Sequence, residues 1–423
     1  MATAVTSVEE VCRAAKRAAG ALAQCDSAVK DAALAAIADA LERRVAEIVA
    51  ANERDMELAR EADIGDALLD RLRLDDGRVS AIARAVRDIA ALADPVGEVI
   101  DGWRLPNGLE VRKVRVPLGV VAVVYEARPN VTIDATALCL KAGSAIVLRG
   151  SSSATHSNAA LAQIASEAAV SAGLPEGAVS LVAGGGREEL AELARQTASV
   201  DLIIPRGGES LKHALMEHAT VPVIYAASGN CHVYVDASAD LGRAEAIILN
   251  AKLQRPGVCN AAETLLVHSE AADAFLPPAL AALAQAGVEI RADQRALEIA
   301  QGAGTAVTPA TAEDWDEEYL APTLAVAVVD SVQEAIDHIA AHGSGHSEAI
   351  VTRDAAAARR FQRAVDAACV YVNASTRFTD GGEFGMGAEI GNSTQKLHAR
   401  GPIGLRELCT YKYLIEGDGH VRS

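Results

Sequence analysis

The sequence predicts an α/β protein built from parallel sheets with helices on both faces, and three observations lead to this prediction. Apolar residues make up 50% of the chain but aromatic residues only 3%, so Ala, Val, Leu and Ile must fill the core. Continuous apolar strands alternate with amphipathic helices, which is the pattern of parallel sheets buried on both faces. At 423 residues the chain is long enough for two or three domains.

The first hundred residues are expected to be helical. Leu, Ile and Val recur at helical spacing between charged residues in three Ala-rich stretches, 8–24, 27–62 and 78–93. The pattern changes over 103–116, where two short strands flank Pro106-Asn107-Gly108. Since Asn-Gly is the strongest short-range hairpin signal, this segment is predicted to form a β-ribbon.

Two series of apolar strands follow. The first is expected at 119–125, 144–150, 179–184 and 200–205, and the second near 231–235, 263–268, 324–329, 348–352 and 369–373. Ligands bind beyond the carboxyl ends of such strands. The loops expected to line a site therefore begin at Glu126, Arg149, Gly184 and Pro205. The last strand, 407–415, has no obvious partner in the sequence, and it is predicted to join the ribbon of a neighbouring subunit.

Charge and cysteine content exclude several classes of protein. The 39 basic and 57 acidic residues give a net charge of −18, which argues against nonspecific binding to nucleic acid or anionic membranes. The first 25 residues mix charged and apolar residues, unlike a signal peptide, and no uncharged apolar run is long enough to span a bilayer. The seven cysteines are scattered without a CxxC pair, so we expect a cytoplasmic protein without disulfide or zinc frameworks.

One cysteine stands in a setting that suits a nucleophile. In the stretch KLQRPGVCNAAETLLVH (252–268), Cys259 follows a tight turn at Pro256-Gly257 and has Arg255 nearby. Backbone N–H groups at such a turn, together with a cation, would favour the thiolate that attacks carbonyl carbons. Taken alone, however, a cysteine is more often a buried structural residue, and the local pattern leaves that alternative open.

Six stretches in the same order make the chain similar to a known family. They are VPLGVVAVVYEARPNVT (116–132), KAGSAIVLRG (141–150), IPRGG (204–208), QRPGVCNAAETLLVH (254–268), EYLAPTLAV (318–326) and FGMGAEIGNSTQKLHARGPIGLRELCTYKY (384–413). The first five resemble the aldehyde dehydrogenase superfamily. The RPGVCNAAET block and the long tail resemble the γ-glutamyl phosphate reductase (glutamate-5-semialdehyde dehydrogenase) family within it.

This resemblance implies an aldehyde dehydrogenase-like fold with two Rossmann-like parallel-sheet domains and a small β oligomerisation element. The cofactor-binding domain would comprise 1–100 and 119–229, and the catalytic domain 230–392. The β element would comprise 101–118 and 403–417, and the protein would form a homo-oligomer.

The resemblance also implies the chemistry. Cys259 corresponds to the nucleophile, and Asn130 to an amide that donates a hydrogen bond to the oxyanion, although Asn130 could instead be a helix N-cap. Oxidising relatives carry a water-activating Glu where this chain has Ala226, within PVIYAASGN (222–230). Without that base, water is a poor acceptor for the acyl group, so the acyl-enzyme resists hydrolysis. The implied reaction is therefore the NADPH-dependent reduction of L-glutamyl 5-phosphate to L-glutamate 5-semialdehyde and phosphate, the second step of proline biosynthesis from glutamate.

The cofactor NADP(H) is expected to bind without a standard fingerprint. No GxGxxG occurs, and Gly184-Gly185-Gly186 is better interpreted as a turn before a helix. By resemblance, Arg149 and Ser152 occupy the places that hold the adenosine ribose, and a cation without a carboxylate suits a 2′-phosphate. Glu318 matches a ligand of the nicotinamide ribose, and Arg206, Gly207 and Gly208 match the pyrophosphate loop. Each could instead be a surface residue.

The substrate, γ-glutamyl phosphate, needs cations for its carboxylate and phosphate. Arg377, which aligns with the substrate mouth of the superfamily, and Arg128 are the leading candidates. Solvated surface charge is the alternative for these two residues and for three further candidates, Glu126, Lys396 and Arg400. We expect no metal site. The spacing of His338, His342 and His346 is broken by glycine, and the adjacent Cys231 and His232 should point to opposite faces of a strand.

Two rival functions stay open at this stage. An enzyme that oxidises free semialdehydes would need a water-activating base at position 226, where this chain has alanine, and it would turn over without phosphate. A catalytically silent scaffold protein would have lost Cys259, Asn130 or Glu318, all of which are present. The sequence also leaves open an association with a glutamate 5-kinase that supplies the labile substrate.

Overall fold

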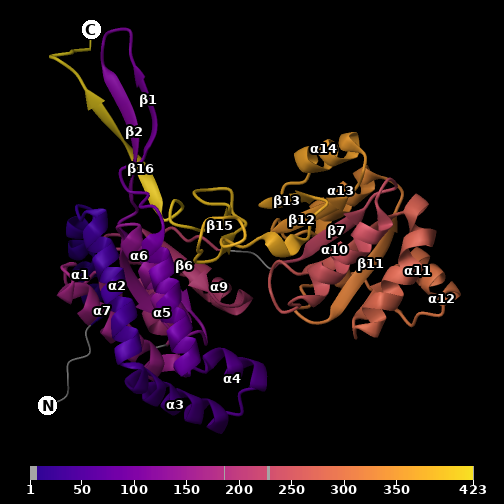
Figure 1. Cartoon of the computed structure of the whole chain (residues 1–423), viewed down its shortest axis with the longest axis horizontal. Helices are drawn as coiled ribbons and strands as arrows, with labels where there is room; N and C mark the ends of the chain where they lie inside the picture. The colour runs from indigo at the N-terminus through magenta and orange to yellow at the C-terminus, as the bar shows by residue number, and fades with distance from the viewer. Residues whose placement is uncertain (1–6, 185, 226–228, 423) are drawn as a thin grey trace. The chain divides into compact units, whose positions relative to one another are not determined.

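The structure, a computed structural model, describes residues 7–184, 186–225 and 229–422. It divides into two compact units. Unit 1 comprises Met1–Tyr225, Gly385–Gly391 and Ile403–Ser423, and unit 2 comprises Ala226–Phe384 and Asn392–Pro402. Each unit contains one parallel sheet with helices on both faces (Figure 1), so the predicted α/β class is confirmed.

Unit 1 is built on a four-stranded parallel sheet in the order β5-β4-β3-β6. The strands are β5 (Val179–Leu181), β4 (Ala145–Arg149), β3 (Val120–Tyr125) and β6 (Leu202–Arg206). Apolar residues of α1 (Val8–Leu22), α8 (Arg187–Leu193) and α9 (Glu209–Met216) share a core with one face of this sheet. Four further helices pack together and contact the sheet through α6 and α7: α2 (Ser27–Arg43), α5 (Asp76–Ala91), α6 (Asn130–Lys141) and α7 (Thr155–Ser171).

The helical region differs from the prediction in two places. The stretch expected as one helix over 27–62 is two helices, α2 and α3 (Val45–Glu61), because Arg44 leaves the helical conformation at φ −107° and ψ 22°. A short helix that the sequence did not indicate, α4 (Asp66–Leu72), follows. Helical spacing of apolar residues continues through Arg44, so periodicity alone could not locate the break.

The predicted β-ribbon is confirmed, but the predicted partner of the last strand is wrong. β1 (Val99–Arg104) and β2 (Glu110–Pro117) form an antiparallel hairpin whose turn places Gly108 at φ +96°. β16 (Cys409–Glu416) pairs antiparallel with β2 of the same chain, from Cys409 opposite Pro117 to Glu416 opposite Glu110. The three strands extend together from the helices of unit 1 (Figure 1). The pairing spans about 300 positions of sequence, beyond the reach of local patterns.

Unit 2 contains a seven-stranded parallel sheet in the order β10-β9-β11-β8-β7-β12-β13. The five strands expected here are present as β7 (Cys231–Val235), β8 (Ala262–His268), β11 (Thr323–Val329), β12 (Ser347–Val351) and β13 (Cys369–Val372). Two further strands were not expected: β10 (Thr308–Pro309), at one edge of the sheet, and β9 (Glu289–Ala292), between β10 and β11. β14 (Asn392–Ser393) and β15 (Gly401–Pro402) form a separate two-stranded pair.

Helices cover both faces of this larger sheet (Figure 1). α10 (Leu241–Leu253), α11 (Ser269–Gln285) and α12 (Gln294–Gly302) share a core with Leu265 and Val267 of β8. α13 (Val332–His342) and α14 (Ala355–Ala364) share a second core with Leu266. Successive residues of one strand thus enter different cores, which explains why the strands are apolar throughout.

None of the seven cysteines, all of which lie in the described part of the chain, forms a disulfide bond. Among the described residues, no helix has the length and apolarity needed to cross a membrane.

Candidate functional site

Cys259 lies on the loop that connects α10 to β8. Asp240 caps the start of α10 by accepting a hydrogen bond from Arg243 N at 3.2 Å, and the helix ends before Pro256, which cannot donate to the helical hydrogen-bond ladder. A turn in which Ala261 N donates to Val258 O at 3.0 Å then leads into β8. Cys259 is half-buried at this turn. The nucleophile candidate is therefore held on a short connection between two regular elements.

Two neighbours fix the backbone of Cys259. The thiol of Cys231, at the start of β7, donates a hydrogen bond to Cys259 O over 3.2 Å. Burial raises the pKa of Cys231 well above its ordinary value, so this thiol keeps its proton and remains a donor. Gly229 lies so close that a Cβ there would be 1.8 Å from Cys259 O. Only glycine fits at that position.

Arg377 belongs to the same site. It lies in the 3-10 turn Thr376–Phe378, and its Nε donates to Gln254 Oε1 at 2.8 Å. Asn260, next to the nucleophile, donates through Nδ2 to the carbonyls of Arg377 and Thr379 at 3.3 and 3.0 Å. Burial lowers the pKa of Arg377, while the charge of Cys259 raises it. The structure thus brings together a predicted substrate cation and the predicted nucleophile.

Glu318 also lies beside Cys259, through Gly229. Its Oε1 accepts a hydrogen bond from Gly229 N at 2.7 Å, and Glu318 itself is half-buried. Because Gly229 contacts the Cys259 backbone, the carboxylate predicted to hold the nicotinamide ribose is attached to the nucleophile loop through one residue. Ala226, where the water-activating Glu of oxidising relatives would stand, is outside the described residues, as is Gly185 of the triple-glycine turn.

The pyrophosphate candidates lie at the carboxyl ends of strands in unit 1. Gly208 is the N-cap residue of α9, and its N–H donates to Glu126 Oε2 at 3.0 Å. Gly207 must be small, since a Cβ there would lie 2.5 Å from the same oxygen. Arg206 ends β6 and packs closely against Gly391, which has φ +146°. This helix N-terminus already accepts one anionic group, the Glu126 carboxylate.

Arg149 and Ser152 follow one another at the end of β4 but differ in exposure. Arg149 is only 5% exposed, and its Nη2 donates to Gly186 O at 2.6 Å. Burial lowers the pKa of Arg149, and the charges of Glu189 and Glu126 raise it. Ser152 is exposed in the 3-10 turn Ser152–Ala154. The cation is thus part of the protein interior, whereas the hydroxyl faces solvent.

Asn130 is the first residue of α6, and Pro129 is the N-cap, so the alternative role of Asn130 as a helix cap is not the one observed. Its Nδ2 donates to Asp134 Oδ2, one helical turn later, at 2.9 Å. Arg128 is half-buried in the preceding turn, where its carbonyl accepts from Val131 N at 3.0 Å. The Asn130 amide therefore has its orientation fixed by a carboxylate, a partner that sequence reasoning missed although the four-residue spacing was visible.

The remaining charged candidates have other partners. Lys396 and Arg400 both form ion pairs with Asp366 in unit 2. His338 contacts His342 and Trp315 ring to ring, and His346 is buried beside Cys231. Within residues 7–184, 186–225 and 229–422, no three His, Cys, Asp or Glu side chains gather so as to hold a metal ion. His232, adjacent to Cys231, instead contacts Glu348 Oε2 through Nδ1 at 3.0 Å.

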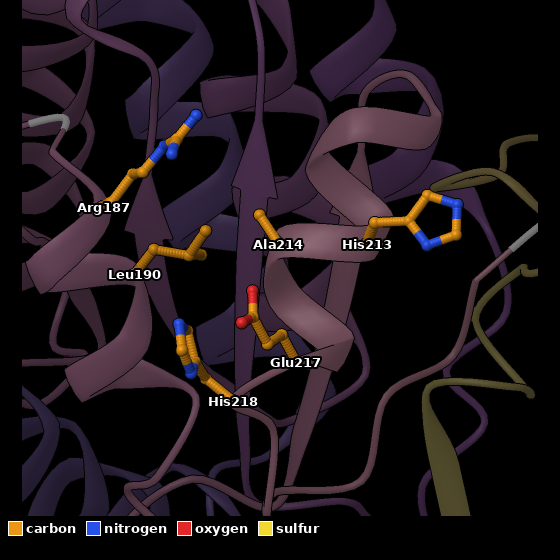
Figure 2. Close-up of a pocket in the computed structure, with 6 residues that line it drawn as sticks. All are labelled: Arg187, Leu190, His213, Ala214, Glu217 and His218. Atoms are coloured by element: carbon orange, nitrogen blue, oxygen red, sulfur yellow. The ribbon is translucent and has the colours of Figure 1, made fainter.

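A surface cavity of about 310 Å³ lies between α8 and α9 of unit 1. Figure 2 shows the side chains that line it: Arg187, Leu190, His213, Ala214, Glu217 and His218. Sequence reasoning did not select these residues. The signal available was their position on the two helices that follow β5 and β6.

Comparison with known proteins identifies the family. The family model described as "Aldehyde dehydrogenase family" matches residues 1–313 and 305–413. The chain therefore belongs to the aldehyde dehydrogenase family, whose members work with a nicotinamide cofactor. Solved structures of more distant relatives agree on the fold alone, for example a probable aldehyde dehydrogenase from Listeria monocytogenes (21% identity, TM-score 0.71).

More similar proteins carry a narrower name. The chain is 56% identical to the γ-glutamyl phosphate reductase of Thermobifida fusca, and the match covers 98% of each chain. It is 55% identical to the γ-glutamyl phosphate reductase of Syntrophomonas wolfei, and that match covers 96% of each chain. The crystal structure of the γ-glutamyl phosphate reductase from Thermotoga maritima matches with a TM-score of 0.96 at 46% identity. That match covers 99% of this chain and 100% of the other.

Proposed function

We propose that this protein reduces L-glutamyl 5-phosphate to L-glutamate 5-semialdehyde and phosphate, with NADPH as reductant, in the biosynthesis of proline from glutamate. The observation that carries the proposal is identity above one half, over nearly the full length, to proteins named for this reaction. The half-buried Cys259, with Arg377 beside it, supports the same chemistry.

In the proposed mechanism, the Cys259 thiolate attacks the acyl carbon of the substrate and phosphate departs. Asn130 Nδ2 and the N–H of Cys259 donate hydrogen bonds to the oxyanion of each tetrahedral intermediate. NADPH, when bound, supplies the hydride that the thioester accepts. Proton transfer and collapse of the thiohemiacetal then release the aldehyde and restore the Cys259 thiolate. Ala226 has no ionisable side chain that could activate water against the thioester.

The cofactor residues of unit 1 fit a phosphorylated dinucleotide. The α9 N-terminus holds the Glu126 carboxylate at Gly208 N, so this position accepts an anion. Arg206, Gly207 and Gly208 would hold the pyrophosphate, and Glu318 the nicotinamide ribose. The exposed Ser152 would contact the 2′-phosphate, and the buried Arg149 would attract it through its charge, which Glu189 and Glu126 partly offset. The cavity between α8 and α9, where Leu190 and Ala214 offer apolar contacts among four polar residues, would receive the adenine ring.

The direct test couples the protein to a glutamate 5-kinase. A mixture of the purified protein with NADPH, glutamate, ATP and the kinase should lose NADPH absorbance. Omission of either ATP or the kinase should abolish that loss. In reverse, the oxidation of glutamate 5-semialdehyde by NADP⁺ should require inorganic phosphate, because phosphate must take the acyl group from Cys259. Oxidation at full rate without phosphate would instead identify an aldehyde oxidiser.

We also propose that the three-stranded sheet β1-β2-β16 mediates assembly into a homo-oligomer. The proposed domain limits are those expected from the sequence, with the β oligomerisation element at 101–118 and 403–417. β1 and β16 are the edges of the sheet, and its exposed large side chains include Trp103, Tyr411, Tyr413 and Ile415. Apolar aromatic surface of this kind is typical of interfaces. Sedimentation of Tyr413→Lys should show a smaller species than the parent protein. The same experiment with added glutamate 5-kinase would detect the proposed association of the two enzymes.

A further inference from the structure

Beneath the Cys259 loop lies a buried ion pair that the proposed mechanism does not use. Lys252 is in the last turn of α10, Glu263 is the second residue of β8, and both are 0% exposed. Lys252 Nζ lies 2.5 Å from Glu263 Oε2. Removing two charges from water costs several kcal/mol per ion, and a replacement by apolar residues is often as stable. A pair retained at such a cost calls for a role beyond stability.

The two residues enclose the nucleophile along the chain. Lys252 precedes Cys259 by seven positions and Glu263 follows it by four. The connection that carries Cys259 therefore leaves α10 next to one charge and enters β8 next to the other. The ion pair joins the two ends of this loop at its base.

Glu263 has a second contact, on the segment that carries Glu318. Its Oε1 accepts a hydrogen bond from Leu320 N at 3.4 Å, and Leu320 adopts the left-handed conformation at φ +50°. A Cβ placed on Gly257 would lie 3.6 Å from Leu320 O, so the nucleophile loop packs directly on this segment. One carboxylate thus contacts both the base of the Cys259 loop and the neighbourhood of Glu318.

The contacts return to Cys259 by another route. Glu318 accepts the hydrogen bond from Gly229 N, and Gly229 lies against the Cys259 backbone. A displacement of the Leu320 segment would therefore reach Cys259 both through Glu263 and through Gly229. All these residues belong to unit 2.

We infer that Lys252 and Glu263 form a positioning pair that holds the Cys259 loop and the Glu318 segment in one fixed arrangement. The inference rests on the roles proposed above for Cys259 and Glu318. Neither Lys252 nor Glu263 is proposed to touch the reacting atoms. They act by fixing the distance between the nucleophile and the carboxylate that would orient the cofactor, and a misplacement of about 1 Å at such a site can cost about 100-fold in rate.

Burial acts against the charged form of both members of the pair. Burial raises the pKa of Glu263 to about 7, and the charge of Lys252 opposes this rise. Burial likewise lowers the pKa of Lys252, against the charge of Glu263. Substitutions that keep both charges, or that remove both, therefore avoid leaving one buried charge unpaired, which is the strongly destabilising case.

The experiment compares three variants with the wild-type protein. Glu263→Asp keeps the charge but withdraws the carboxylate from Leu320 N. The double variant Lys252→Met/Glu263→Leu removes both charges at similar volume. The matched control is Lys30→Met, which breaks a Lys–carboxylate pair of unit 1 in which Lys30 Nζ lies 2.5 Å from Asp94 and Lys30 is 1% exposed. The measurements are thermal unfolding, the rate of Cys259 alkylation by iodoacetamide against pH, and kcat and KM for NADPH.

We expect Glu263→Asp to unfold near the wild-type temperature, to react with iodoacetamide roughly tenfold more slowly and to lose about 10- to 100-fold in kcat. Its KM for NADPH should rise with the change at Cys259, because both depend on one carboxylate. The double variant should fold but share these defects, whereas Lys30→Met should lose stability only.

The inference would be overturned if Glu263→Asp kept the wild-type alkylation rate and the wild-type kcat. It would also be overturned if a folded double variant kept both of these rates. If the double variant does not fold, Glu263→Asp alone decides. Alkylation needs neither substrate nor cofactor, so it tests the arrangement of the loop even if the wild-type protein proves inactive on γ-glutamyl phosphate. That inactivity would refute the proposed function and leave the positioning result interpretable.

Discussion

The two units place their buried charges in different ways. In unit 1 the buried lysines pair with carboxylates that are partly exposed: Lys141 is 2% exposed and its partner Asp31 40%, while Lys30 and Asp94 are 1% and 11% exposed. In unit 2 both partners are fully buried in Lys252–Glu263 and in His232–Glu348. The first arrangement joins α2 to α6 and to the connection after α5, and the second lies within and beside the central sheet.

This difference matches the proposed roles of the units. A unit that receives an anionic cofactor needs N–H groups and cations at its strand ends, and its buried pairs need only join its helices. A unit that holds a nucleophile must keep a loop in one geometry, and hydrogen-bonded charges in a low-dielectric interior are directional enough to do so. Unit 2 should therefore tolerate polar substitutions near Cys259 less well than unit 1 tolerates them near its anion site. The following predictions test that contrast.

The largest effect is expected at the nucleophile in unit 2. Cys259→Ala removes the group that forms the thioester, so turnover should fall by at least about 10⁴-fold. NADPH binding, measured by fluorescence titration, should remain within about twofold of wild type because the proposed cofactor residues are intact. Residual turnover near the wild-type rate would transfer the nucleophile role to another residue and remove the basis of the comparison.

In unit 1, Asn130→Ala should produce the next largest effect. The loss of one oxyanion donor lowers kcat by about 10²–10³-fold, with little change in KM, because the hydrogen bond strengthens only as negative charge develops. Steady-state kinetics of Asn130→Ala and of the near-isosteric Asn130→Asp should both reveal the defect, since Asp lacks the N–H donor. A change confined to KM would indicate that Asn130 binds substrate instead.

A smaller effect is expected on the preference for NADPH over NADH when Ser152 is replaced. Ser152→Glu places a carboxylate beside the proposed 2′-phosphate position, where it should repel NADPH and offer hydrogen bonds to the free ribose of NADH. The ratio of kcat/KM for NADPH to that for NADH should fall by about tenfold or more. Ser152 is exposed, so the fold should be undisturbed. The neutral variant Ser152→Gln is the control and should change the ratio much less.

The smallest effect concerns pH and the Asp134 carboxylate. Burial raises the pKa of Asp134 from 3.8 to about 6, against the opposing effects of Asn130 and Arg206. Because the folded pKa exceeds the unfolded one, the stabilisation from this group is complete below about pH 3.8 and is lost as pH rises through about 6. Asp134→Asn cannot ionise and lacks this loss.

Between pH 4.5 and 7.5, the free energy of unfolding of Asp134→Asn should therefore improve relative to wild type, by at most about 2 kcal/mol. Urea midpoints at several pH values measure the difference. A constant difference across this range would mean that Asp134 titrates with an ordinary pKa.

The sequence by itself determined the α/β class, the two series of strands, the Asn-Gly hairpin and the turn that carries Cys259. These features are local: apolar periodicity reports burial, and turn residues report backbone conformation. Family resemblance then assigned chemistry to individual positions, including the significance of Ala226.

Only the tertiary structure decided which groups meet. It paired β16 with β2 of the same chain and ended a helix at Arg44. It also brought the Arg377 carbonyl to the Asn260 amide and the Glu318 carboxylate to the Gly229 N–H. It also buried Lys252 against Glu263. A strand edge or a charge carries no local mark of its partner, because the partner is brought to it by the packing of distant elements. For that reason the candidate residues could be chosen from the sequence, but the contacts that hold them could not.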